Sequence, residues 1–175
     1  MKRRSRRRPF HAAVVALLAF AFCGGLVRAN APVGRYTIGI GIVVDTKTQL
    51  AWQQPVSSSE YGWAAASSYC ASLSLAGSGW RVPSVSELLT LVDESRQAPA
   101  IDPNAFPNTA LGPWWTSSSL AAHPTYAWTV SSQDGSTTFF DVGTALPVRC
   151  TRSPAGTPVT DAGSPGTDAE AGSIQ

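Results

Sequence analysis

Outside its first thirty-one positions the sequence has few basic residues, and this shortage argues against one large class of function. Seven of the thirteen Lys and Arg precede residue 32, which leaves six basic against eleven acidic residues and a net charge of −5 in the remainder. Nucleic-acid-binding domains gather Lys and Arg on one face of the fold. Here the six are scattered, at Arg35, Lys47, Arg81, Arg96, Arg149 and Arg152. We therefore expect no nucleic-acid partner.

The sequence also lacks an apolar run long enough to span a membrane as a helix. Its longest candidate, Ala12–Phe22, has about eleven residues, whereas a hydrocarbon core of ~30 Å needs about twenty. The run follows a basic cluster, Met1–Arg8, and precedes small residues at Ala29 and Ala31. This order predicts a signal peptide over residues 1–31, cleaved before Pro32, and hence an exported protein without a stable membrane span. The alternative is an uncleaved N-terminal anchor.

Cysteine and histidine are scarce beyond the predicted signal peptide. Only Cys70, Cys150 and His123 remain there. A structural zinc site takes four nitrogen or sulfur ligands, so we expect no metal and no cofactor. A pair of cysteines in an exported protein indicates a disulfide, and we predict the bond Cys70–Cys150. A metal site or a reactive thiol is the alternative for these two residues.

Motifs for hydrolysis are missing as well. The chain contains no Gly-x-Ser-x-Gly nucleophile elbow, the turn that exposes the serine of many hydrolases. His123 lies in an expected loop, with Ser117, Ser118 and Ser119 nearby in sequence. A catalytic triad is defined by geometry, so sequence does not exclude one. We favour a solvated loop histidine and expect a non-enzymatic protein.

Residues 32–152 have the length of one domain, and their patterns predict an α+β fold. In the N-terminal half, alternation over Tyr36–Val44 predicts one half-buried strand with Ile38 and Ile40 inward and Val43 outward. Residues 49–53 then form its hairpin partner. A helix over 61–75, capped by serines at 57–59, should bury a stripe made by Trp63, Ala66, Cys70 and Leu73.

A second helix begins at a capping box. Ser84 and Glu87 have the spacing in which each side chain satisfies a backbone donor of the other, and the apolar face that follows comprises Leu88, Leu91 and Val92. Residues 98–113 form a loop that places Ile101 and Phe106 on the core. Strands are expected over 114–118, 126–132, 137–142 and 145–152, with an Asp-Gly hairpin turn between the second and third. The composition of residues 153–175 predicts a disordered tail.

Three features invite a binding interpretation. Trp114 and Trp115 point to opposite faces of a strand, so we expect one indole to be exposed and able to stack on a sugar, whereas Trp52, Trp63, Trp80 and Trp128 fit core positions. Arg81 lies between buried groups and could bind a sulfate or carboxylate; we favour a structural role, pairing with Glu87 or satisfying loop carbonyls. The string 102–104, Asp-Pro-Asn, is read as a turn rather than a calcium site.

Several motifs in one order carry a family resemblance. They are the turn Asp45–Thr48 before Leu50–Trp52, the spacing of Trp63, Ala66 and Cys70, Trp80–Ser84 with Glu87–Leu88, Ile101, Phe106–Pro107, Trp115–Ser118, Ala127–Trp128 and Val148–Cys150. Over residues 36–152 the chain resembles the bacterial Lcl C-terminal-like domain family, named for the end domain of a collagen-like adhesin. The resemblance implies a C-type-lectin-like fold, related to that of the formylglycine-generating enzymes.

The resemblance also implies a function. It predicts placement in the periplasm, at the cell surface or outside the cell and, for the adhesin member, binding of sulfated polysaccharide. We therefore expect two helices packed on small antiparallel sheets, with one disulfide, in a lectin-like module that binds a polysaccharide or a cell-surface protein. The alternatives are an enzyme on a formylglycine-generating-enzyme-like scaffold and a purely structural envelope domain. The chain lacks a collagen-like Gly-x-y region.

Overall fold

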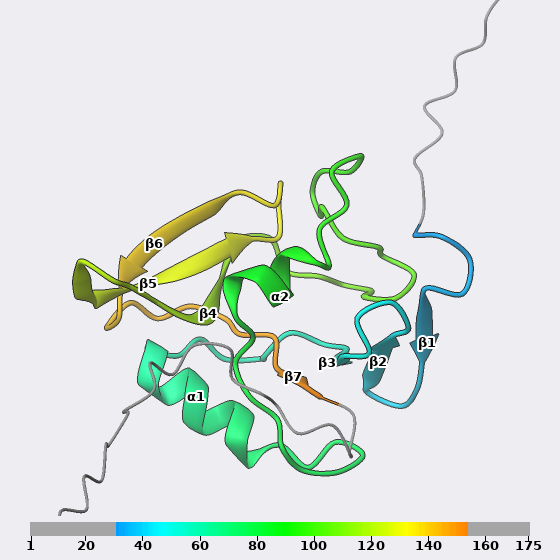
Figure 1. Ribbon diagram of the computed structural model, residues 1–175, viewed down its shortest axis with the longest axis horizontal. Helices are drawn as coiled ribbons and strands as arrows, with labels where there is room; N and C mark the ends of the chain where they lie inside the picture. The colour runs from blue at the N-terminus through cyan, green and yellow to red at the C-terminus, as the bar shows by residue number, and fades with distance from the viewer. Residues whose placement is uncertain (1–30, 154–175) are drawn as a thin grey trace, which may run out of the picture.

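A computed structural model describes residues 31–153 (Figure 1). These residues form two helices and two small antiparallel sheets, which confirms the predicted α+β class. The elements are β1 (Tyr36–Ile38), β2 (Ile42–Asp45), β3 (Ala51–Gln53), α1 (Trp63–Ser72), α2 (Val85–Leu89), β4 (Pro113–Leu120), β5 (His123–Ser131), β6 (Thr137–Asp141) and β7 (Thr151–Arg152). Except for Ala31 and Ser153, the predicted signal peptide and tail lie outside the described residues. Within residues 31–153, no helix has the length and apolar character needed to cross a membrane.

The first sheet has the strand order β1-β2-β3-β7 and joins the two ends of the domain. Strand β7 pairs with β3, with Trp52 opposite Thr151. A bridge between Arg81 and Thr151 continues the hydrogen bonding on the other side of β7. Of the predicted strand 145–152, only β7 is regular, although Leu146 makes an isolated bridge to Tyr61. Pro147 interrupts this segment because it has no backbone N–H to donate.

The prediction of a single strand over Tyr36–Val44 is wrong, because the structure has two strands there. The chain reverses between β1 and β2, where Gly39 N donates to Ile42 O at 2.9 Å and Gly41 adopts a φ of +74°. Such a φ suits glycine, which has no Cβ. Ile40 therefore lies at the hairpin tip, fully exposed, and Val43 is buried instead of facing outward.

The second sheet, β4-β5-β6, agrees with the sequence analysis. The β5–β6 turn contains Gly135 at a φ of +78°, as its Asp-Gly dipeptide predicts. Strands β4 and β5 are joined at the other end, where Leu120 pairs with His123. The predicted hairpin of β5 and β6 is present, and β4 pairs with β5. His123, which we expected in a loop, begins β5.

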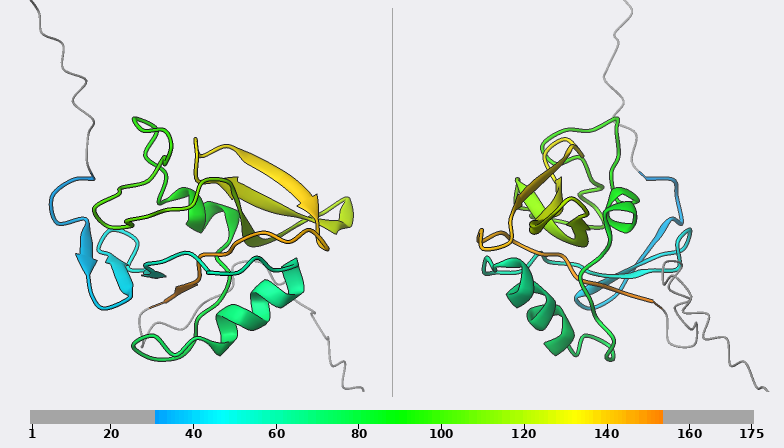
Figure 2. Two further views of the ribbon diagram at one scale, coloured as in Figure 1. Left: turned by 180° about the vertical axis from the view of Figure 1, so that it is seen from behind. Right: turned by 60° about the vertical axis from the view of Figure 1, so that its left-hand side comes forward.

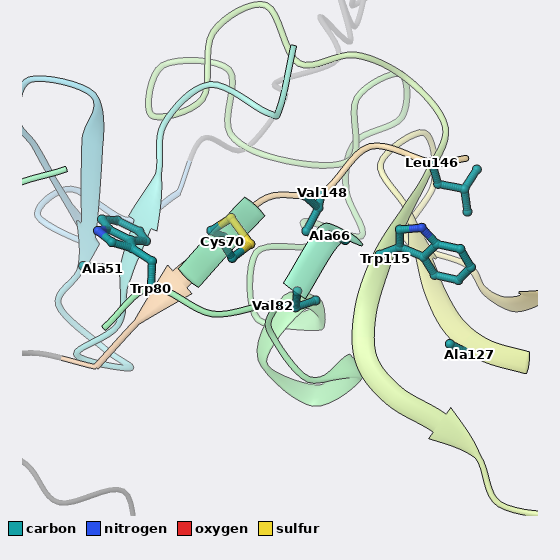
Figure 3. Close-up of a cluster of buried hydrophobic side chains, with 10 residues drawn as sticks. Ala51, Ala66, Cys70, Trp80, Val82, Trp115, Ala127, Leu146 and Val148 are labelled. Atoms are coloured by element: carbon teal, nitrogen blue, oxygen red, sulfur yellow. A yellow bond between two sulfur atoms is a disulfide. The ribbon is translucent and has the colours of Figure 1, made fainter. Parts of the chain in front are cut away.

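Two hydrophobic cores lie on opposite sides of β4. One, against α1, contains Trp115, Trp80 and Ala127 (Figure 3). The other, against α2 and the 98–112 loop, contains Trp114 and Phe106. Because both faces of β4 are covered at this point, both neighbouring indoles are buried, with 2% and 0% of their surface exposed. The expectation that one of them is exposed is therefore wrong.

The two helices begin differently from one another. Helix α1 starts after Gly62 without a side-chain cap, because Ser57 is used elsewhere: its Oγ donates to Ser59 O and accepts from Val148 N. The predicted serine cap is wrong, and the helix is shorter than 61–75. Helix α2 has the predicted capping box between Ser84 and Glu87.

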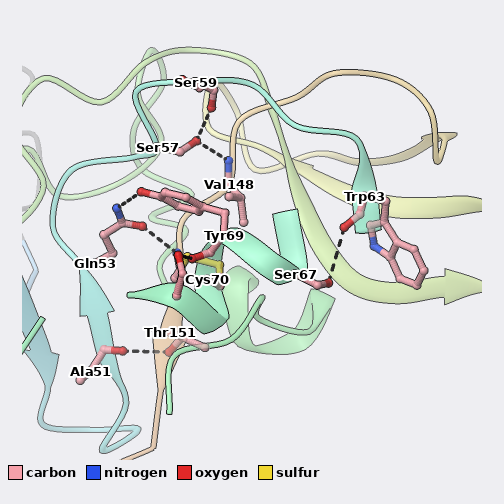
Figure 4. The surroundings of a disulfide bond; sticks show 12 residues. Ala51, Gln53, Ser57, Ser59, Trp63, Ser67, Tyr69, Cys70, Val148 and Thr151 are labelled. Atoms are coloured by element: carbon pink, nitrogen blue, oxygen red, sulfur yellow. Dashed lines mark hydrogen bonds between the residues drawn. A yellow bond between two sulfur atoms is a disulfide. The ribbon is translucent and has the colours of Figure 1, made fainter. Parts of the chain in front are cut away.

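The disulfide Cys70–Cys150 is present and connects α1 to the segment before β7 (Figure 4). Both cysteines are completely buried. Gln53 supports the same junction, since its Nε2 donates to Tyr69 Oη at 2.8 Å and its Oε1 accepts from Cys150 N at 3.3 Å. The bond therefore fastens α1 to the segment that leads into β7 of the first sheet.

Candidate ligand-binding surface

The predicted tryptophan site is not on the surface. Trp115 Nε1 donates to Tyr61 O at 2.7 Å inside the first core, and the Trp114 ring packs against the Arg149 guanidinium in the second, at 4.7 Å from the ring centre. Neither indole offers a face to a ligand in this structure. Their role is to fill the two cores that flank β4.

Arg81 has the structural role that we favoured. Its Nη1 and Nη2 bind the two carboxylate oxygens of Glu87 at 2.7 and 2.6 Å, and Glu87 also accepts from Ser84 N at 2.8 Å. Partial burial raises the pKa of Glu87, but the hydrogen bonds from Arg81 and Ser84 outweigh it and hold the pKa below its usual 4.5. The pair locks the segment before α2 onto the helix, and its charges cancel.

Asp102 opens a turn, as expected. Its Oδ1 accepts from Asn104 N at 2.8 Å and its Oδ2 from Ala31 N at 3.1 Å. Both carboxylate oxygens thus serve backbone donors. In the part of the chain that the structure describes, no three or more His, Cys, Asp or Glu side chains gather as a metal site would require.

A shallow cleft of about 420 Å³ lies beside β1, lined by residues that include Arg35, Tyr36, Asp93 and Asp102. Arg35 is already paired with Asp45, Nη2 to Oδ2 at 3.1 Å. Burial raises the pKa of Tyr36 to about 12, so its hydroxyl stays protonated at neutral pH. None of these groups is arranged as a nucleophile hydrogen-bonded to a base, the pairing that covalent catalysis needs.

Arg149 is the most unusual charged residue, and the sequence analysis counted it only as a scattered cation. Its side chain is completely buried, and its Nη1 donates to the carbonyls of Gln53, at 2.8 Å, and Gln54. The guanidinium lies 4.6 Å from the Phe106 ring centre and close to Trp114. Burial lowers its pKa to about 9, so it stays charged at neutral pH. Arg149 thus joins β3 to the C-terminal segment from inside the second core.

Four aromatic side chains form a row on the outer part of the second sheet. This row, called the aromatic ridge below, consists of His123, Tyr126, Trp128 and Phe139. Successive ring centres are 6.4 Å apart from His123 to Tyr126, and 5.7 Å apart from Phe139 to each of the other two. The planes of each pair meet at 82° to 90°, the edge-to-face arrangement that aromatic pairs prefer. Tyr126 is 36% and Phe139 47% exposed.

Strand register accounts for the aromatic ridge. Trp128 lies directly opposite Phe139, and Tyr126 opposite Asp141, and residues two apart on a strand share a face. Val130 continues this face, but it is buried in the second core with Leu88 of α2. Helix α2 is short, and the β5–β6 hairpin extends past it (Figures 1 and 2). The face is therefore covered at one end and open at the other.

The aromatic ridge was not predicted from the sequence. We expected Trp128 in the core and His123 in a loop, whereas Trp128 is only half-buried and His123 is an exposed strand residue. A signal was present in the alternation of Tyr126 and Trp128, which places both rings on one face. Aromatic residues on the same face of two neighbouring strands indicate a cross-strand cluster. Which residues of the two strands lie opposite each other is, however, decided by the folded structure and not by the alternation within one strand.

Comparison with known proteins identifies the domain. The curated proteins compared with this chain include none that matches it in sequence. The family model of the Lcl C-terminal domain matches residues 41–152, which is most of the described fold, including the disulfide and the aromatic ridge. The chain therefore belongs to the Lcl C-terminal domain family, a bacterial surface-associated family.

Proposed function

We propose that this chain is an exported, non-enzymatic binding module of the bacterial cell envelope that attaches to glycan through the aromatic ridge. Membership of a surface-associated family supports an adhesin-like or envelope role. The observation that carries the proposal is the row of four rings on an open sheet face. Exposed apolar groups gathered in one place are typical of interaction sites.

The chemistry of the rings suits a sugar. A pyranose has an apolar face of C–H groups and a rim of hydroxyls, so it can lie against an aromatic ring and keep its polar groups in water. Aromatic side chains bury a large area with few rotatable bonds. In the aromatic ridge the rings also hold one another in place, because Phe139 contacts both Tyr126 and Trp128. Little ordering entropy is then lost on binding.

An enzyme on a related scaffold is the less supported alternative. Such an enzyme would need several titratable groups around a pocket. Chemistry by a reactive cysteine pair is not supported, because Cys70 and Cys150 are bonded to each other and the described residues contain no further cysteine. The C-type-lectin-like name remains a prediction from the resemblance. Binding through rings does not call for calcium, unlike sugar binding by many lectins of that class.

The proposal is tested by screening the purified, oxidised chain against immobilised oligosaccharides, with calcium and with chelator. We expect calcium-independent binding that is lost in Phe139→Ala. The control is Ile40→Ala, which removes a fully exposed apolar side chain from the tip of the β1–β2 hairpin, far from the second sheet in sequence. Retained binding in Phe139→Ala, or its loss in Ile40→Ala, contradicts the assignment to the aromatic ridge. Absence of binding by folded protein contradicts glycan attachment itself.

A further inference from the structure

We propose that the ligand of the aromatic ridge is an uncharged oligosaccharide and that sulfated or carboxylated chains are excluded. This inference rests on the proposed function and specifies its ligand class. It runs against the expectation from the resemblance, in which the adhesin member binds sulfated polysaccharide.

The second sheet contains no cationic Lys or Arg. Residues 97–148, which include β4, β5 and β6, have neither residue type. The same segment contains the acids Asp102, Asp134 and Asp141. Asp141 is exposed and stands directly opposite Tyr126 on the ridge face. The fixed charge nearest the aromatic ridge in register is therefore negative, and a polyanion would be repelled there.

The cations elsewhere in residues 31–153 are engaged within the fold. Three arginines form ion pairs: Arg35 with Asp45, Arg81 with Glu87 and Arg96 with Asp93. An arginine recognises sulfate or carboxylate by presenting the fork of its guanidinium to the ligand. A guanidinium already bound to a carboxylate would have to break that pair first.

The other three cations also lie outside the second sheet. Arg149 is completely buried. Arg152 donates to Ala76 O at 2.9 Å and lies over the Trp80 ring. Lys47 is the sole lysine of the described residues and belongs to the β2–β3 turn of the first sheet. Within residues 31–153, the Lys and Arg side chains therefore form no cluster beside the second sheet that could compensate for its acidic residues.

A neutral sugar is not repelled by the acidic residues of the second sheet, and it can form hydrogen bonds with Asp141. The Oδ1 of Asp141 accepts from Gly143 N at 2.8 Å, which fixes the orientation of the carboxylate. An ionised carboxylate has about four acceptor positions, so it can also accept hydrogen bonds from hydroxyl groups. A ring face beside an oriented carboxylate thus matches a sugar that presents C–H groups and hydroxyls together.

The test compares two classes of probe by calorimetric titration of the whole oxidised chain. The neutral probes are hexasaccharides of glucose, mannose, xylose and N-acetylglucosamine, and the anionic probes are heparin, chondroitin sulfate and dextran sulfate. We expect binding to at least one neutral probe and to no anionic probe. The affinity should stay nearly constant between about 0.05 and 0.5 M salt, because no ion pair is screened.

Three variants locate the site and test the charge argument. Phe139→Ala should weaken neutral binding about tenfold or more, and Ile40→Ala should leave it unchanged. Asp141→Asn keeps the acceptor for Gly143 but loses the negative charge, so it should weaken neutral binding by a smaller factor. Near-ultraviolet circular dichroism checks that each variant is folded.

The possible failures are distinguishable. Salt-sensitive binding of heparin or dextran sulfate that Phe139→Ala abolishes overturns the uncharged-ligand inference and leaves glycan attachment through the aromatic ridge intact. Folded protein that binds none of the probes overturns the proposed function as well. Neutral binding of unchanged affinity in folded Phe139→Ala places the site elsewhere and overturns both.

Discussion

Loss of the disulfide should cost this domain a large part of its stability. Cys70 and Cys150 are 80 residues apart in sequence, and in the chain-entropy model a cross-link of this length lowers the entropy of the unfolded chain by about 15 cal/mol/K, or about 4.5 kcal/mol at 25 °C. Domains of this size have a free energy of unfolding of roughly 5–15 kcal/mol. The reduced protein should therefore be marginally stable.

The assay is urea denaturation followed by tryptophan fluorescence, with oxidised protein, reduced protein and the double variant Cys70→Ala/Cys150→Ala. The reduced protein keeps both side chains, so its difference from the oxidised protein isolates the cross-link. The double variant should lose somewhat more, because it also removes two buried sulfur atoms. A loss below about 1 kcal/mol on reduction would refute the reasoning. It would mean that residual structure in the reduced, unfolded chain already limits its entropy.

Three further changes test the local interactions. Burial raises the pKa of Glu87 in the folded protein, but the hydrogen bonds from Arg81 and Ser84 outweigh it and lower the pKa. The resulting stabilisation is present above pH 4.5 and is lost as the pH falls through the folded pKa. Glu87→Gln should therefore be less stable at neutral pH, and its melting temperature should fall less steeply at acidic pH than that of the unchanged protein. Trp114→Ala should cost about 3–5 kcal/mol in urea denaturation, and a change below about 1 kcal/mol contradicts its place in the second core. Gly135→Ala should lower the melting temperature, because the site has a positive φ and the new Cβ would collide with Val92 Cγ1. Adding Val92→Ala to this variant should restore part of the melting temperature. If it restores none, backbone strain and not the collision is the cause.

The features that sequence predicted correctly depend on local chemistry. The capping box of α2 needs only Ser84 and Glu87 at their spacing, and the β5–β6 turn needs only its Asp-Gly dipeptide. The disulfide follows from the number of cysteines in a chain that is predicted to be exported. In each case the residues that make the structure are sufficient to indicate it, with little dependence on the rest of the fold.

Incorrect predictions arose where alternation was extended across a turn or where burial depended on distant segments. Gly39 and Gly41 flank Ile40 and allow the chain to reverse, which places Val43 on the buried face. Trp114 and Trp115 do point to opposite faces of β4, but sequence does not tell that both faces are covered. That outcome depends on α1 on one side and α2 with its loop on the other.

The candidate site was the least predictable part. The aromatic ridge exists because Phe139 is opposite Trp128 and because α2 ends before it reaches Tyr126. Neither the strand register nor the end of the helix can be predicted from the sequence of one strand. Arg149 gave no sequence signal of burial either, since the groups that contact its guanidinium are backbone carbonyls and ring faces from distant segments.

The central claim is that the open rings of the second sheet bind an uncharged sugar. Its most direct test is calorimetric titration of neutral hexasaccharides into the oxidised chain and into Phe139→Ala, with heparin as the charged comparison. The account predicts binding of a neutral hexasaccharide that the variant weakens about tenfold or more, and no binding of heparin. Binding of heparin, or neutral binding of equal affinity in both proteins, would contradict it.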